Sequence, residues 1–297
     1  MRKPLMILLL SITVLSTARS GLFEQLPMVR TVAIDVSGIR LSARLYPAAS
    51  DEPGPAIILL HGWSWPEYDP SAGLVMPARE FQRAGFTVLV PTMRGWPPSG
   101  GDDDCAGQQV DDVLQALDWL GQQPEVDAGS RFLAGFSQGG QVALLAATRN
   151  APVRAVAAFA PVVDPGRWGD ETNIDGIRDY IMEECGGPEG WRARNVMNRV
   201  ETLRQPLLLV HGDADLRVPT QQSVGLYEKL VSLQRPVQIK LIPGAQHDQD
   251  EVLQPQLAID FFRDTADPWP LFDMSFQRKG RKKNHLQVCS CQLQAGL

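Results

Sequence analysis

Short apolar segments alternate with amphipathic helical segments through most of this sequence, and this alternation limits the fold more than any other feature. Residues 56–60 and 86–90 are largely apolar runs next to Pro or Gly, as expected for strands covered on both faces. Residues 75–84 and 109–120 carry apolar side chains at helical spacing. The order strand, helix, strand, helix predicts an α/β fold with a mostly parallel central sheet and helices on both faces.

The same alternation continues through one domain, which we place at residues 21–266. A hairpin is expected at 29–46, further strands at 131–134, within 153–163, at 206–210 and at 237–242, and helices at 141–148 and 222–233. Residues 164–200 interrupt the pattern with a mostly polar segment that is too long for a routine connection. We interpret this segment as a helical, cap-like insertion near the edge of the sheet that carries the site.

The two ends of the chain differ in composition from this domain. Residues 1–20 combine a basic start, an apolar core and a small-residue cleavage site at 18–20, which is the pattern of a secretory signal peptide. An uncleaved anchor is the alternative, although the apolar core is short for a membrane span. Residues 267–297 include five cations in the six positions 278–283, and we expect a basic, disordered tail without chemistry. We therefore predict a secreted or periplasmic protein with no stable membrane insertion after signal cleavage.

Charge and cysteine content narrow the function further. The formal net charge of −6 gives no overall basic field for a nucleic-acid backbone, so no nucleic-acid partner is expected. Cys289 and Cys291 lie close together in the tail and lack the spacing of a metal site. Cys105 and Cys185 remain as the pair for a disulfide in an exported chain, and two buried free thiols are the alternative. We predict no metal and no cofactor.

The sequence Gly-Phe-Ser-Gln-Gly-Gly at residues 135–140 joins a predicted strand to a predicted helix. A Ser between two glycines at such a corner is the pattern of a nucleophile elbow, in which a tight turn lifts the hydroxyl out at the helix N-terminus. An N-capping Ser in a Gly-rich turn is the alternative. We predict that Ser137 is a catalytic nucleophile.

A serine nucleophile needs a base, which is usually a histidine held by a carboxylate. Of the four histidines, His61 and His211 end strands and precede Gly, which suits side chains that support a turn, and His285 lies in the tail. His247 follows the last strand, on a loop beside the predicted elbow, and is our candidate for the base. The chain offers two aspartates after the preceding strand, and either could orient the imidazole.

Backbone N–H groups are expected to stabilise the oxyanion of the reaction. One donor should be Gln138, which follows the nucleophile, and the other should be Trp63, on the loop after the strand at 56–60. Trp63, Trp65 and Trp96 gather on loops after strands. They either line an apolar pocket or pack beneath the loops.

Three blocks of the sequence resemble the catalytic blocks of α/β-hydrolases, in particular those of the catalytic domain of the prolyl oligopeptidase family of serine peptidases. The blocks are GFSQGG at 135–140, HGDADLRVP at 211–219 and PGAQH at 243–247. The helix expected between the second and third blocks strengthens the likeness, which covers most of residues 55–263. The resemblance implies the α/β-hydrolase fold.

The resemblance also implies a triad of Ser137, Asp215 rather than Asp213, and His247. Two features depart from the family. Its members usually carry an N-terminal β-propeller that gates peptide entry, whereas only about 35 residues separate the expected cleavage site from the first parallel strand, which is too few for a propeller. The loop after Gly62 also lacks the Gly-Pro continuation that is common in the family.

We therefore predict a serine hydrolase that cleaves an amide or ester bond through an acyl-enzyme, with serine peptidase activity of the prolyl oligopeptidase type favoured. A carboxylesterase, or an esterase similar to dienelactone hydrolase, shares the fold and the triad and is the first alternative. A non-catalytic binding module with the same fold is the second. The expected partner is a small ester or a peptide, and the oligomeric state stays open.

Overall fold

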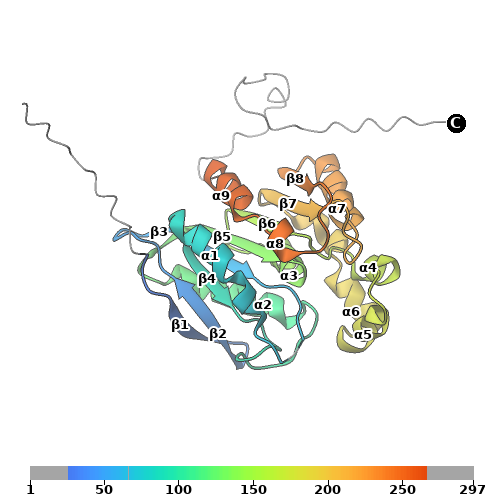
Figure 1. Ribbon diagram of the computed structural model, residues 1–297, viewed down its shortest axis with the longest axis horizontal. Coiled ribbons are helices and arrows are strands. Elements are labelled where there is room, and N and C mark those ends of the chain that lie inside the picture. Colours follow the sequence, from blue (N-terminus) through green and yellow to red (C-terminus); the bar gives the residue numbers. More distant parts are fainter. Residues whose placement is uncertain (1–25, 66, 266–297) are drawn as a thin grey trace, which may run out of the picture.

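The computed structural model describes residues 26–65 and 67–265, which form an eight-stranded sheet with helices on both faces (Figure 1). The strands are β1 (Arg30–Val36), β2 (Ile39–Tyr46), β3 (Gly54–Leu60), β4 (Thr87–Pro91), β5 (Val126–Phe136), β6 (Ala155–Phe159), β7 (Leu207–Gly212) and β8 (Val237–Ile242). Their order in the sheet is β1-β2-β4-β3-β5-β6-β7-β8. The pairs β1–β2 and β2–β4 are antiparallel and all other pairs are parallel. The predicted α/β fold with a mostly parallel sheet is confirmed.

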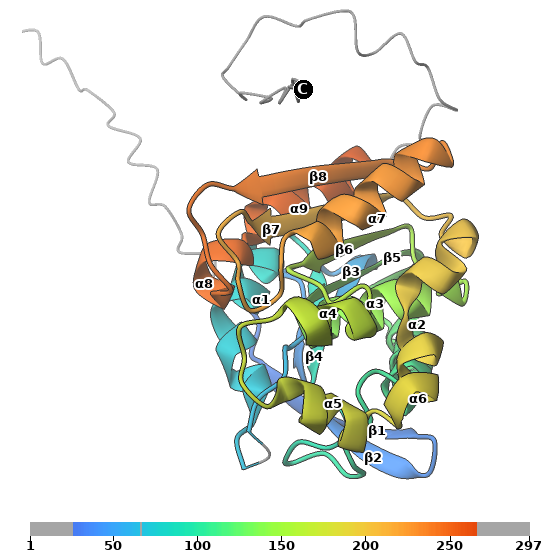
Figure 2. The ribbon, with the colours of Figure 1, turned by 90° about the vertical axis from the view of Figure 1, so that its right-hand side faces the viewer.

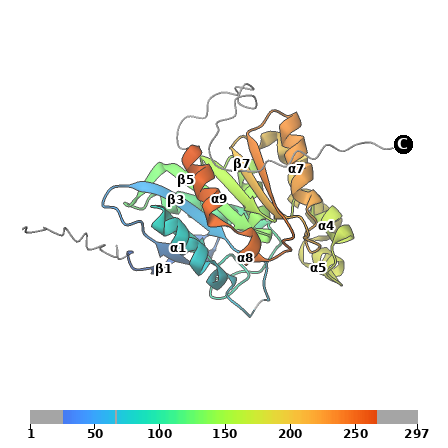
Figure 3. The same cartoon turned by 45° about the horizontal axis from the view of Figure 1, so that its top comes forward.

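Helices cover both faces of the sheet. The helices of the described residues are η1 (Pro70–Leu74), α1 (Val75–Arg83), α2 (Gln108–Gly121), α3 (Gln138–Thr148), α4 (Pro165–Glu171), α5 (Ile177–Glu184), α6 (Gly187–Arg194), η2 (Val196–Thr202), α7 (Gln221–Ser232), α8 (Gln249–Val252) and α9 (Pro255–Asp264). Helices α1 and α9 lie side by side on one face, in front of the sheet in Figure 3. Helices α2, α3 and α7 pack on the other face.

Strand β3 explains why both faces must be covered. Its successive side chains point to opposite faces, so Ile58 and Leu60 belong to the core cluster that includes residues of α2, α3 and α7, while Ile57 and Leu59 belong to the cluster that includes residues of α1 and α9. All four side chains are fully buried. Burial of one such side chain contributes about 1.5–3 kcal/mol, so loss of either helical layer would strongly destabilise the sheet.

Two parts of the fold differ from the sequence prediction. Strand β5 begins at Val126, before the predicted start at 131, and α3 begins at Gln138 rather than at 141. Helices α8 and α9 were not predicted, although α9 places Ala258, Ile259 and Phe262 at helical spacing against the core. The prediction placed His247 on a loop after the last strand and assigned no element beyond it, so the helix that packs beside α1 was missed.

Residues 164–200 form α4, α5, α6 and η2, which lie beyond the carboxyl ends of the parallel strands (Figures 1 and 2). The Trp168 Nε1–H of α4 donates to the Arg217 carbonyl at 2.7 Å. At the other end, the Arg194 Nε–H of α6 donates to the Asp104 carbonyl at 2.9 Å. The segment is therefore attached on both sides of the strand ends.

The segments expected to be a signal peptide, residues 1–20, and a basic tail, residues 267–297, lie outside the described residues. Within the described part of the chain, no helix has the length and apolar character needed to cross a bilayer.

A disulfide joins Cys105, on the loop after β4, to Cys185, which follows α5. The two residues are 80 positions apart, and their Cα atoms are 5.2 Å apart. This bridge is the cysteine pair expected from the sequence. It attaches the middle of the α4–α6 segment covalently to the main domain.

A buried ion pair holds the loop after β4 against α2. Arg94 Nε and Nη2 donate to the two carboxylate oxygens of Asp112 at 2.6 and 2.7 Å, and the side chains are only 5% and 2% exposed. Arg94 Nη1 also donates to Gln108 Oε1 at 2.6 Å. Two parallel hydrogen bonds of this kind fix both orientation and distance, so the start of the Cys105 loop is rigidly placed.

We expect the double substitution Cys105→Ser, Cys185→Ser to lower the free energy of unfolding by about 2–4 kcal/mol, because the unfolded chain loses a long covalent loop. Urea denaturation of the purified protein measures this change. Wild-type protein unfolded with a reductant present should give the same midpoint as the variant. Equal stability of the oxidised wild type and the variant would contradict the prediction.

We expect Asp112→Ala to lower the free energy of unfolding by about 3–5 kcal/mol, because the Arg94 charge would stay buried without its partner. Asp111→Ala is the matched control, since Asp111 lies on the same helix in an exposed pair with Arg149, and its effect should stay below about 1 kcal/mol. Guanidinium denaturation of both variants compares the two. A similar decrease in the free energy of unfolding in both variants would show that the buried pair stabilises the fold no more than the exposed pair.

Candidate active site

The strand–helix corner between β5 and α3 requires glycine on both sides of Ser137. A Cβ on Gly135 would lie 2.2 Å from the Gly139 carbonyl oxygen, and a Cβ on Gly139 would lie 2.4 Å from the His61 carbonyl oxygen. Ser137 itself has φ 53° and ψ −117°, which is a strained conformation for a residue with a side chain. The turn therefore has the geometry of a nucleophile elbow.

The structure brings Ser137, His247 and Asp215 into one hydrogen-bonded chain. His247 Nε2 lies 2.9 Å from Ser137 Oγ, and His247 Nδ1 lies 2.6 Å from Asp215 Oδ2. Since a carboxylate can only accept, Nδ1 carries the proton and Nε2 is free to accept from the serine hydroxyl. This is the arrangement in which a histidine can act as a base toward a serine.

The Asp215 carboxylate is fully buried and receives several hydrogen bonds. Its Oδ1 accepts the backbone N–H groups of Arg217 and Val218 at 2.9 and 2.8 Å. Burial by itself would raise the pKa of Asp215, but hydrogen bonds from His211 and His247 outweigh burial and hold the pKa well below its ordinary value. Asp215 is therefore ionised and oriented at neutral pH.

His211 is a second imidazole beside this carboxylate. Its Nε2 lies 2.8 Å from the Val218 carbonyl and 3.3 Å from Asp215 Oδ2, and its Nδ1 lies 2.7 Å from Ser223 Oγ. Both neighbours of Nε2 are acceptors, so Nε2 carries a proton. His211 thus supports the loop that carries Asp215, in line with the supporting role expected for it.

The rival aspartate, Asp213, points elsewhere. It is exposed, and its Oδ1 accepts the Gly244 N–H at 2.7 Å. Asp248, another carboxylate near His247 in sequence, accepts the Asp250 N–H and caps α8. Neither contact reaches the imidazole.

His61 supports the loop after β3. Its Nε2 accepts the Met93 N–H at 2.9 Å, so Nδ1 carries the proton and donates to the Gly62 carbonyl at 2.7 Å. Complete burial lowers the pKa of His61 to about 4. Trp96 packs edge-on against the His61 ring, is 1% exposed and donates its Nε1–H to the Ser64 carbonyl.

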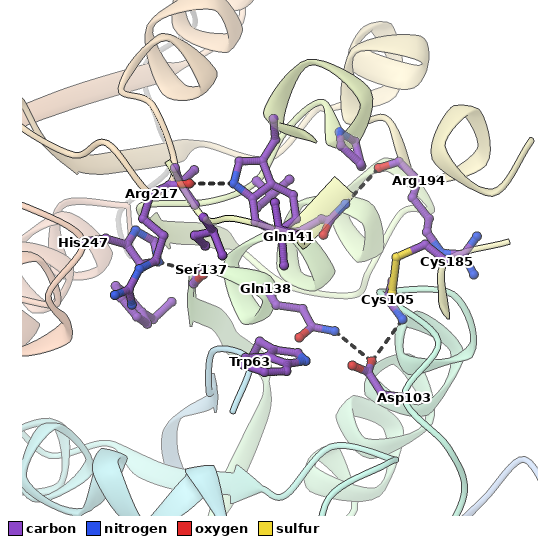
Figure 4. Close-up of a pocket in the computed structure, with 18 of the residues that line it drawn as sticks. Trp63, Asp103, Cys105, Ser137, Gln138, Gln141, Cys185, Arg194, Arg217 and His247 are labelled. Carbon is purple, nitrogen blue, oxygen red and sulfur yellow. Dashed lines mark hydrogen bonds between the residues drawn. A yellow bond between two sulfur atoms is a disulfide. The ribbon is translucent and has the colours of Figure 1, made fainter. Parts of the chain in front are cut away.

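A cavity of about 600 Å³ opens beside Ser137 and His247 (Figure 4). Its walls are mainly apolar and come from the loops after β3 and β6, from β5 and from the α4–α6 segment. The apolar side chains are Trp63, Trp65, Phe136, Val162, Pro165, Trp168, Ile174 and Ile177. Cys105 and Cys185 also line it, so the disulfide forms part of one wall. Of the three tryptophans considered from the sequence, two line the cavity and Trp96 packs beneath the loop.

Sequence reasoning did not identify several residues of this cavity. Gln141 lies one helical turn after Ser137 and could have been found from that spacing. Trp168, Ile174 and Ile177 come from the segment without periodicity, which gave no signal for their direction. No cluster of His, Cys, Asp or Glu within the described ranges could hold a metal ion.

Comparisons with known proteins found relatives of several kinds. Uncharacterized peptidase YtmA of Bacillus subtilis (strain 168) is 31% identical over 182 residues, which cover 57% of this chain and 68% of that protein. Polyketide transferase grgF of Penicillium sp is 25% identical over 284 residues, which cover 77% of this chain and 93% of that protein. The solved structure of a puromycin hydrolase superposes with a TM-score of 0.72 at 21% identity, and the match covers 81% of this chain but 39% of that one.

The last of these similarities is a likeness of fold alone, because its sequence identity is low. The family model described as the prolyl oligopeptidase family matches residues 79–267, which include the elbow and the loops of Asp215 and His247. Since this match extends over more than half of the sequence, the chain belongs to the prolyl oligopeptidase family, whose members are serine hydrolases.

Proposed function

We propose that this protein hydrolyses amide or ester bonds through an acyl-enzyme formed on Ser137, with peptidase activity favoured. The observation that carries the proposal is the hydrogen-bonded chain from Ser137 Oγ through His247 to the buried Asp215. His247 Nε2 takes the proton of the hydroxyl as the oxygen attacks the substrate carbonyl, and returns it to the leaving group. Asp215 holds the ring and stabilises the imidazolium.

The backbone N–H groups of Gln138 and Trp63 are the proposed donors to the oxyanion. A Cβ on Gly62 would lie 3.3 Å from Ser137 Cβ, so the loop after β3 packs directly against the nucleophile. His61 holds the Gly62 carbonyl. Because the peptide bond is planar and trans, the N–H of Trp63 points away from that carbonyl and from His61. This contact fixes the orientation of the peptide that carries the Trp63 N–H.

The cavity favours a substrate with an apolar or aromatic group on the acyl side, since most of its exposed wall is apolar. Family membership supports peptides as substrates. The esterase alternative stays open because one of the similar proteins is a polyketide transferase rather than a peptidase. Both alternatives use the same nucleophile and are separated by comparing amide and ester substrates with one acyl group.

Export of the protein is also part of the proposal. The disulfide between Cys105 and Cys185 supports it, because such bridges persist in oxidising compartments and are rare in the cytosol of most organisms. Together with the pattern of residues 1–20, the bridge favours a secreted or periplasmic location.

We expect a fluorophosphonate probe to label the wild-type chain, Ser137→Ala to abolish labelling, and His247→Ala to slow it by at least 100-fold, because the hydroxyl then has no base. Gel fluorescence against time measures the rates. Asp213→Asn is the matched control for Asp215→Asn, and only the latter should slow labelling strongly. An unlabelled but folded wild type would favour the non-catalytic binding module.

We expect acid to destabilise the protein through His61 between pH 6.5 and pH 4. The unfolded state binds a proton near the ordinary His pKa of 6.5, whereas the folded state does so only near 4. The stability that neutral His61 provides is therefore complete above pH 6.5, falls by about 3 kcal/mol on the way to pH 4, and changes no further below it. The contribution of Asp215, with its lowered pKa, is lost only below about pH 4 and does not overlap.

Denaturation at pH 7, 5.5 and 4 tests this expectation, with His61→Gln as the comparison. The variant should lose less stability than wild type over this range. Because the variant could fold poorly, an NMR titration of wild-type His61 is the second measurement. If the His61 imidazole titrates near pH 6.5 in the folded protein, the prediction is wrong.

A further inference from the structure

The side chain of Gln138 faces the cavity beside the nucleophile. Gln138 directly follows Ser137, begins α3 and is 7% exposed. It lines the cavity together with Ser137 and His247. The backbone N–H of this residue already has a proposed role, whereas its side chain has none.

Hydrogen bonds fix which way the Gln138 amide points. Its Nε2 donates to Asp103 Oδ1 at 3.0 Å and to Gln109 Oε1 at 3.2 Å. Gln109 cannot be reversed, because its Oε1 accepts the Ala106 N–H at 2.8 Å while its Nε2 donates to Asp103 and to the Arg94 carbonyl. The nitrogen of Gln138 thus faces two acceptors, and its oxygen must face the opposite direction.

That oxygen, Gln138 Oε1, is occluded and has no hydrogen-bond partner among the described residues. Figure 4 shows the nitrogen end of the amide turned to Asp103 and the oxygen end turned toward Trp63, which also lines the cavity. Buried polar atoms without partners are rare in folded proteins and unfavourable. A hydrogen-bond donor on a bound substrate would give this oxygen the partner that it lacks in the free protein.

We propose that Gln138 Oε1 accepts a hydrogen bond from an N–H group on the acyl part of the substrate. This inference rests on the proposed function and narrows its substrate class to derivatives that carry nitrogen beside the reacting carbonyl, such as α-amino acid esters, amino acid amides and peptides. The side chain starts one residue from the acylated oxygen, so its amide can reach substituents of the α-carbon. The donor is an α-ammonium or an acylamino N–H, and both offer the same chemistry to a carbonyl oxygen.

The occluded position of Oε1 defines how the donor enters. The substrate nitrogen must enter between the Gln138 amide and the indole of Trp63, which is 37% exposed and packs edge-on against Trp65. Shielding from water strengthens a hydrogen bond once it forms. Esters whose acyl part has no N–H group cannot form this hydrogen bond, so the acceptor does not strengthen their binding.

Three p-nitrophenyl esters with one phenyl-bearing acyl chain test the proposal: 3-phenylpropanoate without N–H, L-phenylalanine with an ammonium group, and N-acetyl-L-phenylalanine with an amide N–H. The measured quantity is kcat/KM of each nitrogen-bearing ester divided by that of 3-phenylpropanoate. We expect Gln138→Met to lower this ratio about tenfold relative to wild type for at least one nitrogen-bearing ester, which is the effect of one hydrogen bond. The three esters differ in intrinsic reactivity, but this difference is the same for both proteins and cancels when their kcat/KM ratios are compared.

Gln109→Met is the matched control, because it removes one partner of the same Gln138 nitrogen but keeps Oε1. Its ratio should stay within about twofold of wild type. A fall with the ammonium ester alone, or with the acetylated ester alone, supports the proposal and identifies the donor. Equal ratios in wild type and Gln138→Met, with all three esters hydrolysed, would overturn the inference and leave the hydrolase function intact. No hydrolysis of any ester and no probe labelling would instead reject the proposed function.

Discussion

Close contact between backbones at the strand ends is the constraint on which the site depends. Gly139 lies against the His61 carbonyl, and a Cβ on Gly212 would lie 2.2 Å from the Ala245 carbonyl oxygen. Through the first contact the Ser137 turn packs directly against the loop after β3. Through the second, the loop of Asp215 packs directly against the loop of His247. Because interiors are densely packed, a methyl group at either position would separate pieces that must hydrogen-bond at about 3 Å.

The electrostatics of the site follow from the same packing. The Asp215 charge is taken out of water, yet two backbone N–H groups and two imidazoles donate to it. Such a carboxylate is costly to bury and is tolerated because its acceptor positions are used. His247 is consequently held by a partner that itself has little freedom to move, which keeps Nε2 aimed at the Ser137 hydroxyl.

The residues alone were sufficient to predict the sheet and to indicate Ser137 and His247 at its carboxyl edge, whereas the choice of Asp215 over Asp213 came from the resemblance to the family. Ser137, Asp215 and His247 each follow a strand of the parallel part of the sheet, and parallel strands bring such positions together without knowledge of any long-range contact. The cavity walls could not be predicted in this way, because Trp168 and Ile174 are placed by contacts of α4 and its following loop with the distant residues 216–217. The burial of Trp96 likewise depends on the carbonyl of Ser64, a partner 32 positions away.

The bridge between Cys105 and Cys185 closes a covalent ring in the chain. Residues 106–184 lie inside this ring and include β5, the Ser137 turn, α3 and β6. A single peptide-bond cut by a protease anywhere within the ring would therefore leave the two fragments linked. The part of the molecule that carries the nucleophile stays attached to the part that carries Asp215 and His247, so one cleavage in an exposed loop such as that of residues 172–176 would not by itself divide the site.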